Sequence, residues 1–221
     1  MNDKLVHRGP DAEGFWHDAE RGVYLGHRRL AIVDITGGHQ PMWTRDGQLG
    51  VVFNGEIYNH QELRAELKRM GHVFESDHSD TEVLLHLYAR HGEAMVEHLR
   101  GMYAFAIWDA ASRTMFLARD PYGIKPLYYA AAAGAFRFAS QVKALLAGGA
   151  VSAAIEPAAL AGFLVWGSVP EPFSFHRDIR MLPAGHTLRV DAGGVGAPRK
   201  FWDLGEVILR STQAAAAVPA G

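Results

Sequence analysis

The sequence predicts an α+β fold in which antiparallel sheets and helices occupy separate layers. Two observations lead to this prediction. Strand-like segments open the chain and return after Gly101, and helical segments lie between these two strand-rich regions. Strands that follow one another without an intervening helix pair as antiparallel hairpins, so the helices are expected to cover the faces of such sheets.

Length and composition indicate one large globular domain, or a domain and a half. The 221 residues are 48% hydrophobic and 21% charged, with a formal net charge of −2. This charge gives no general attraction to nucleic acid or to a membrane surface, and the apolar stretches are too short to span a bilayer. We therefore expect a cytoplasmic protein without nucleic-acid or membrane partners. The absence of cysteine excludes disulfides, thiolate metal sites and a cysteine nucleophile in this chain, and the histidines form no metal pattern.

The N-terminal part of the chain is expected to consist mainly of strands. They are predicted over residues 13–17, 22–28, 25–34, 42–44 and 49–53. The last strand is predicted to stop at Asn54-Gly55-Glu56. Such a break places an amide side chain and main-chain N–H groups at the rim of a sheet, where small-molecule sites are commonly built.

Two capping patterns predict helices after this break. Asn59 with Glu62, and Ser79 with Glu82, have the spacing of a capping box. Further elements are expected in order: a strand at 72–75, a helix at 93–99, strands at 102–109, 114–119, 127–131 and 136–140, helices at 141–146 and 157–165, and a strand at 187–190. Residues 150–203 are predicted to close the domain or link it onward, and residues 204–221 to form a disordered tail.

Seven motifs appear in order along the chain. They are HRGPD at 7–11, GHRRLAIVD at 26–34, GHQP at 38–41, FNGEIYN at 53–59, SDTEV at 79–83, RGMYAFA at 100–106 and RDPYGIKPLYY at 119–129. Together they resemble the glutaminase domain of glutamine-hydrolysing asparagine synthetases, a class II glutamine amidotransferase. The resemblance extends from His7 to about Asp203.

The resemblance implies an N-terminal-nucleophile hydrolase fold, a four-layer αββα arrangement with two antiparallel sheets between helical layers. It implies glutamine as the ligand, hydrolysed to glutamate and ammonia. In the family, ammonia passes to a second domain that uses ATP to make asparagine from aspartate. ATP and magnesium would belong to that synthetase domain, which is absent here, and no cofactor is expected in this one. A separate synthetase subunit or a homodimer is a further implied partner.

The resemblance also assigns roles within the site. Arg29 would bind the α-carboxylate of glutamine, within a segment that includes Leu30 and Ile32, and Asp80 would receive the α-ammonium. Gly55 and Glu56 would line the substrate. The side-chain N–H of Asn54 and the main-chain N–H of Gly55 would form the oxyanion hole. Taken singly, an Asn-Gly pair is more often a plain turn, a strand arginine is more often solvated, and Asp80 is more often a helix N-cap.

One feature of the family pattern is missing. The family nucleophile is an N-terminal cysteine, and this chain has none. We therefore expect the chain alone to be inactive as a glutaminase. The first strand of the fold is also expected to be absent, which would leave sheet edges unpaired and a core groove open. The alternatives are a non-catalytic glutamine-binding or regulatory subunit that pairs with a separate synthetase, and a non-functional remnant.

Overall fold

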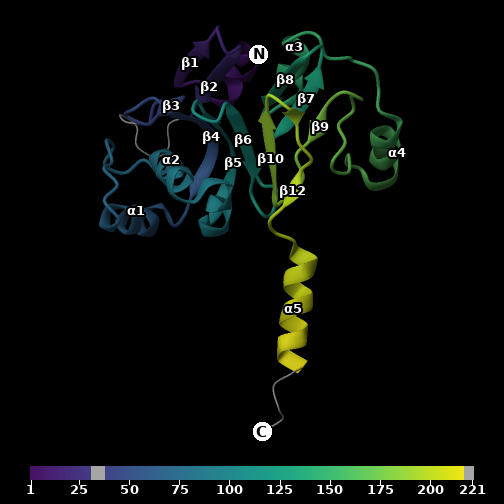
Figure 1. Cartoon of the computed structure of the whole chain (residues 1–221). Helices are drawn as coiled ribbons and strands as arrows, with labels where there is room; N and C mark the ends of the chain where they lie inside the picture. Colours follow the sequence, from purple (N-terminus) through teal and green to yellow (C-terminus); the bar gives the residue numbers. More distant parts are fainter. Residues whose placement is uncertain (31–37, 217–221) are drawn as a thin grey trace.

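Four layers of secondary structure build the protein (Figure 1). The computed structural model describes residues 1–30 and 38–216. Helices cover one face of a central antiparallel sheet, and a second layer of antiparallel strands covers the other face. A short helix then packs outside that second layer. This arrangement confirms the predicted αββα architecture.

The central sheet has the strand order β11-β10-β6-β5-β4-β3, and β12 also pairs with β10. Its strands are β3 (Met42–Trp43), β4 (Leu49–Ile57), β5 (Gly101–Asp109), β6 (Thr114–Arg119), β10 (His186–Asp191), β11 (Gly194–Val195) and β12 (Arg199–Lys200). Every pairing is antiparallel. The run of buried residues in β5 and β6 reflects their position in the middle of the sheet, covered on both faces.

The second layer consists of two separate small sheets. One pairs β1 (Ala12–Asp18) with β2 (Val23–Arg29), and the other has the order β8-β7-β9. The strands of the latter are β7 (Tyr128–Ala132), β8 (Ala135–Ala139) and β9 (Arg180–Met181). Within the described residues, β2 and β8 each pair with a strand on one side only.

Helices on the outer face of the central sheet bury the larger hydrophobic cluster. These are α1 (His60–Arg69), α2 (Asp80–His91) and the 3-10 helix η2 (Gly92–His98). On the other side of the molecule, α3 (Val142–Ala147) packs on β7 and β8, and α4 (Pro157–Trp166) follows it. The chain begins with the 3-10 helix η1 (Asn2–Arg8), beside β2 and α3.

Both capping predictions are wrong in their details. Asn59 and Ser79 precede α1 and α2, but neither side chain caps its helix. Asn59 instead donates to the main-chain oxygen of His98 and accepts from the N–H of Arg100, so it fastens the start of α1 to the loop before β5. The carboxylate of Glu82 binds the main chain at residues 75 and 76. Those bonds hold residues 72–75 in a loop where a strand was expected.

The predicted strand break at Asn54-Gly55-Glu56 is also wrong. Strand β4 continues to Ile57 and stays paired with β5 throughout. Glycine at position 55 makes this possible, because a Cβ atom there would lie 2.1 Å from the main-chain oxygen of Met102. Two strands approach closely at this point, and the pattern read as a turn is a strand with a glycine that permits the approach.

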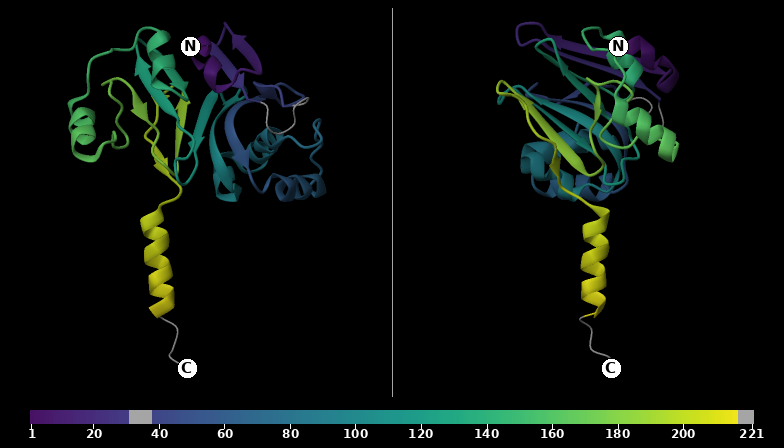
Figure 2. Two further views of the ribbon diagram at one scale, coloured as in Figure 1. Left: turned by 180° about the vertical axis from the view of Figure 1, so that it is seen from behind. Right: turned by 90° about the vertical axis from the view of Figure 1, so that its right-hand side faces the viewer.

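The expected structureless tail is a helix over most of its length. Helix α5 (Leu204–Ala216) extends away from the body in every view (Figures 1 and 2). Asp203 accepts a hydrogen bond from the N–H of Glu206 at its start, and Glu206 pairs with Arg210 one turn later. Residues 217–221 lie outside the described part of the chain. No helix in the described part is long and apolar enough to cross a membrane.

Two buried charged side chains, Asp120 and Arg119, hold the loop after β6 in place. The buried Asp120 carboxylate accepts hydrogen bonds from the main-chain N–H groups of Tyr103, Tyr122, Ile124 and Lys125. The buried Arg119 guanidinium donates to the main-chain oxygens of Lys125, Gly123 and Leu182 and pairs with Glu171. These bonds connect the closing segment of the chain to the central sheet.

Candidate functional site

A polar cavity of about 390 Å³ lies at the end of β4. Six of the seven predicted site residues line it: Arg29, Leu30, Asn54, Gly55, Glu56 and Asp80. The seventh, Ile32, lies outside the described residues. The cavity therefore brings together residues from β2, β4 and the start of α2 that are far apart in the sequence. Their roles toward a ligand stay predictions.

The two charged groups predicted to bind the ends of glutamine are both buried. Arg29 ends β2, and Asp80 begins α2. Each is only 7% exposed. An oxygen of Asp80 accepts a hydrogen bond from the N–H of Ile57, 3.1 Å away, which links α2 to the last residue of β4. Burial raises the pKa of the Asp80 carboxyl. A cation bound beside the carboxyl would act in the opposite direction and favour the ionised form.

Two side chains outside the sheet hold the main chain just before Asn54. The N–H of Phe53 donates to the side-chain oxygen of Gln40 at 2.6 Å, and the oxygen of Phe53 lies 3.0 Å from Nε2 of His27. Strand β3 pairs with β4 only at Gly50 and Val51. The His27 and Gln40 side chains thus take the place of a strand neighbour and fix the position of the Asn54-Gly55 corner.

His27 performs this function as a neutral ring. Burial, with a smaller contribution from the neighbouring positive charge of Arg29, lowers the pKa of His27 to about 4. The main-chain oxygen of Phe53 opposes this shift, but does not cancel it. At neutral pH the ring therefore has one N–H, which Nε2 donates to Phe53.

Sequence reasoning gave His27 and Gln40 no role. A signal for His27 was present, because residues two apart on a strand lie on the same face. Placing Arg29 in a site therefore places His27 toward the same layer. Gln40 sits in a loop, where no periodicity applies, and its role becomes visible only in the structure. His7, Arg8 and Lys125 also line the cavity.

A cavity with a buried guanidinium, a buried carboxylate and a strand corner with amide donors suits a small zwitterion. The family model for the glutamine amidotransferase domain matches residues 1–202. The chain belongs to this family. The predicted site residues of this chain line the cavity between the end of β4 and strand β2 of the second layer.

Curated relatives give the same assignment. Asparagine synthetase [glutamine-hydrolyzing] 1 of Bacillus subtilis is 42% identical over 193 residues, which cover 86% of this chain and 30% of that protein. A putative asparagine synthetase [glutamine-hydrolyzing] of Mycobacterium bovis is 44% identical over 85% of this chain and 30% of its own length. The chain therefore spans about 30% of the length of these relatives.

A solved structure supports the fold. The glutamine phosphoribosylpyrophosphate amidotransferase of B. subtilis, described as complexed with ADP and GMP, superimposes with a TM-score of 0.55. Its sequence is 26% identical, and the match covers 80% of this chain and 34% of that one. The chain is thus a glutamine amidotransferase domain of the asparagine synthetase type, with the N-terminal-nucleophile hydrolase fold.

Proposed function

We propose that this chain binds free glutamine in the cavity at the end of β4. The observation that carries the proposal is the location of Arg29, Asp80 and the Asn54-Gly55 corner around one cavity. In this assignment Arg29 holds the α-carboxylate and Asp80 holds the α-ammonium. The side-chain amide then extends toward the amide donors of Asn54 and Gly55, while Leu30 and Glu56 shape the surrounding wall.

The same proposal holds that the chain alone does not hydrolyse glutamine. Amide cleavage by this family's chemistry needs a thiol nucleophile activated by a nearby base. The sequence contains no cysteine. The donors at Asn54 and Gly55 would stabilise a tetrahedral intermediate, but no thiol of this chain is available to form one.

Titration calorimetry with glutamine tests the binding step. We expect heat of binding for the wild-type chain and a loss of at least about tenfold in affinity for Arg29→Ala and for Asp80→Asn. Matched controls are Arg21→Ala and Asp18→Asn, which alter an ion pair in the β1–β2 turn region. Absence of binding by a folded wild-type chain, or equal losses in the control variants, would refute the proposal.

Ammonia release tests the second step. Purified chain incubated with glutamine is expected to release ammonia no faster than buffer, while calorimetry on the same sample shows binding. Sustained turnover would overturn the claim of inactivity without affecting the claim of binding. A folded chain that neither binds nor hydrolyses glutamine would support the reading of a remnant.

A second candidate is a glutamine-binding subunit that works with a separate synthetase polypeptide or as a homodimer. Helix α5 favours it, because Leu204, Val207 and Ile208 form an exposed apolar stripe at helical spacing. ATP and magnesium would then bind the synthetase partner, and this domain would need no cofactor. Sedimentation of the chain alone, compared with the triple variant in which these three residues are serine, tests self-association. A monomer in both cases would exclude the homodimer.

A further inference from the structure

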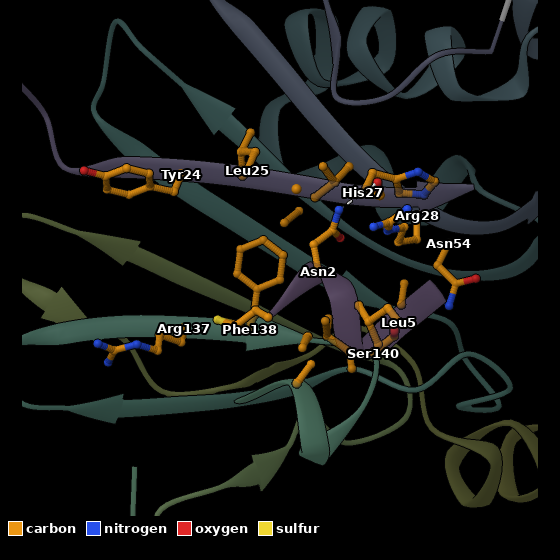
Figure 3. Close-up of a pocket in the computed structure, with 18 of the residues that line it drawn as sticks. Asn2, Leu5, Tyr24, Leu25, His27, Arg28, Asn54, Arg137, Phe138 and Ser140 are labelled. Carbon is orange, nitrogen blue, oxygen red and sulfur yellow. Dashed lines mark hydrogen bonds between the residues drawn. The ribbon is translucent and has the colours of Figure 1, made fainter. Parts of the chain in front are cut away.

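Two hollows of the molecule meet at Asn54, and only one of them has acidic side chains in its described lining. An apolar groove, which Leu25 and Phe138 also line, ends at Asn54 (Figure 3), and none of its described lining residues is an aspartate or a glutamate. The described lining of the polar cavity includes Glu56 and Asp80, of which only Asp80 is buried. Because a buried charge interacts more strongly than an exposed one, recognition of a ligand cation at this corner depends mainly on Asp80.

A buried arginine of α1 holds the main chain directly before Asp80. Arg64 is only 7% exposed. Its Nη1 atom donates to the main-chain oxygen of Ser76 at 2.6 Å, and its Nη2 atom donates to the main-chain oxygen of Ser79 at 2.8 Å. Nη2 also donates to the Ser76 hydroxyl at 3.0 Å. The two nitrogens of one rigid fork thus hold both ends of the segment that leads into α2.

The contact with Ser79 constrains Asp80 through the peptide bond between them. The oxygen of Ser79 and the nitrogen of Asp80 belong to one planar peptide group, so the guanidinium fixes the orientation of that plane. From the other side, the N–H of Ile57 donates to the Asp80 carboxylate at 3.1 Å. The described lining of the polar cavity does not include Arg64, so an effect of Arg64 on a ligand passes through Asp80 and its neighbours.

The Arg64 guanidinium is itself held in one position. The Glu82 carboxylate lies 3.6 Å from its Nη2 atom, and both side chains are 8% exposed. Glu82 also accepts hydrogen bonds from the N–H groups of Glu75 and Ser76 and from the Ser76 hydroxyl. Burial alone would raise the pKa of Glu82, but these hydrogen bonds and the charge of Arg64 hold it below its usual range. The centroid of the Phe74 ring lies 4.2 Å from Cζ of the guanidinium. A rotation of Arg64 would leave the Glu82 carboxylate buried and unpaired, so the fork is fixed.

We infer that Arg64 is a positioning residue for recognition of the ligand's α-ammonium. The inference rests on the proposed binding of glutamine and names the residue that makes that site selective for an amino acid over its analogue without the ammonium. An ammonium–carboxylate contact is a charge-assisted hydrogen bond, and its strength depends on the direction of the carboxylate. Without the fork, the peptide group before Asp80 is free to rotate, and the carboxylate loses its fixed direction. Arg29 on β2 and the Asn54-Gly55 corner on β4 keep their places, so contacts with the rest of the ligand persist.

Calorimetry with two ligands tests the inference. The ligands are glutamine and glutaramate, which is glutamine with a hydrogen atom in place of the α-ammonium. We expect the wild-type chain to bind glutamine at least about tenfold more tightly than glutaramate. In Arg64→Met this ratio should fall to about threefold or less, while glutaramate keeps its wild-type affinity within about twofold. Arg69→Met is the matched control, because Arg69 is exposed in the last turn of the same helix, and it should keep the wild-type ratio.

A double-variant cycle tests whether Arg64 acts through Asp80. In the Asp80→Asn background, the further change Arg64→Met should alter glutamine affinity by less than about twofold, because the contact that Arg64 positions is already lost. Losses that add in the double variant would overturn the inference. Equal losses for glutamine and glutaramate in Arg64→Met would also overturn it, since they would assign Arg64 a general role in stability.

A milder variant decides the question if Arg64→Met does not fold. Arg64→Lys keeps a positive charge beside Glu82, but its single nitrogen cannot replace the two that hold Ser76 and Ser79. We expect its glutamine-to-glutaramate ratio to fall at least about threefold, and a wild-type ratio would overturn the inference. If the folded wild-type chain binds neither ligand, the proposed function fails and this inference with it. If glutamine binds and Asp80→Asn weakens it, but the Arg64 variants keep the wild-type ratio, only this inference fails.

Discussion

Replacing Gly55 with alanine tests whether the close approach of β4 and β5 determines the corner at Asn54. The new Cβ would lie 2.1 Å from the oxygen of Met102 and 2.8 Å from the Cα of Tyr103, whereas ordinary contact begins near 3.4 Å. Both atoms belong to the main chain, so a rotamer change gives no relief. The strands must separate locally, and we expect the free energy of unfolding to fall by about 3 kcal/mol.

Urea unfolding followed by tryptophan fluorescence measures this loss, and glutamine calorimetry on the folded fraction measures the effect on the site. Gly26→Ala is the matched control, because the nearest atoms to a Cβ there lie at 3.5 Å. It should change stability by less than about 0.5 kcal/mol. If Gly55→Ala loses less than 1 kcal/mol and still binds glutamine normally, the role given to the close approach is refuted.

Three further predictions follow from buried charged and titratable groups. Because the folded pKa of His27 is about 4 and the ordinary value is 6.5, unfolding takes up a proton. Stability should therefore fall as pH drops from 6.5 to 4, by up to about 3 kcal/mol, and His27→Leu should flatten that slope in urea titrations at several pH values. Burial raises the pKa of Asp80, so the carboxylate is protonated at a higher pH than an ordinary aspartate. Glutamine affinity should therefore begin to decline at that higher pH as the solution is acidified. Calorimetry across pH should show no such decline for Asp80→Asn. Arg119→Met should lower the free energy of unfolding by at least about 3 kcal/mol, since its bonds to three main-chain oxygens and Glu171 are lost; a small change in the urea midpoint would contradict this.

Much of the fold followed from periodicity and turn residues. Strands β5 to β8 form where apolar and aromatic residues alternate or run together, because their side chains fill the two faces of a pleated sheet. The αββα order, however, came from the resemblance to a known family. Hydrophobic patterns predict which segments have a buried face, but not which sheet covers which.

The local errors arise where a side chain has a distant partner. Asn59 resembles a helix cap in sequence, yet its amide binds residues 98 and 100. Gly55 resembles a turn residue, yet it permits strand contact with β5. In both cases the residue type indicated a local role, and tertiary contacts determined another. The tail was misjudged for a different reason: the helical spacing of Leu204, Val207 and Ile208, which lie before the alanines, was overlooked.

The candidate site was better anticipated than its supports. Arg29, Asp80 and the residues of the corner line one cavity, whereas the side chains that hold the corner were not foreseen. A sequence motif indicates the residues that contact a ligand. It does not indicate the side chains that position those residues, because these come from other layers of the fold. Ile32, which lies outside the described residues, stays a prediction.

The two side chains bound to Phe53 also occupy an otherwise exposed stretch of the edge of β4. An unoccupied stretch of this kind can pair with a strand of another molecule. Replacing His27 or Gln40 would therefore loosen the Asn54-Gly55 corner. The same change would leave a main-chain group of Phe53 unpaired and available to a strand of another molecule. In this protein, loss of ligand affinity and a tendency to aggregate should appear together in such variants, so that soluble yield would serve as an early indicator of damage at the site.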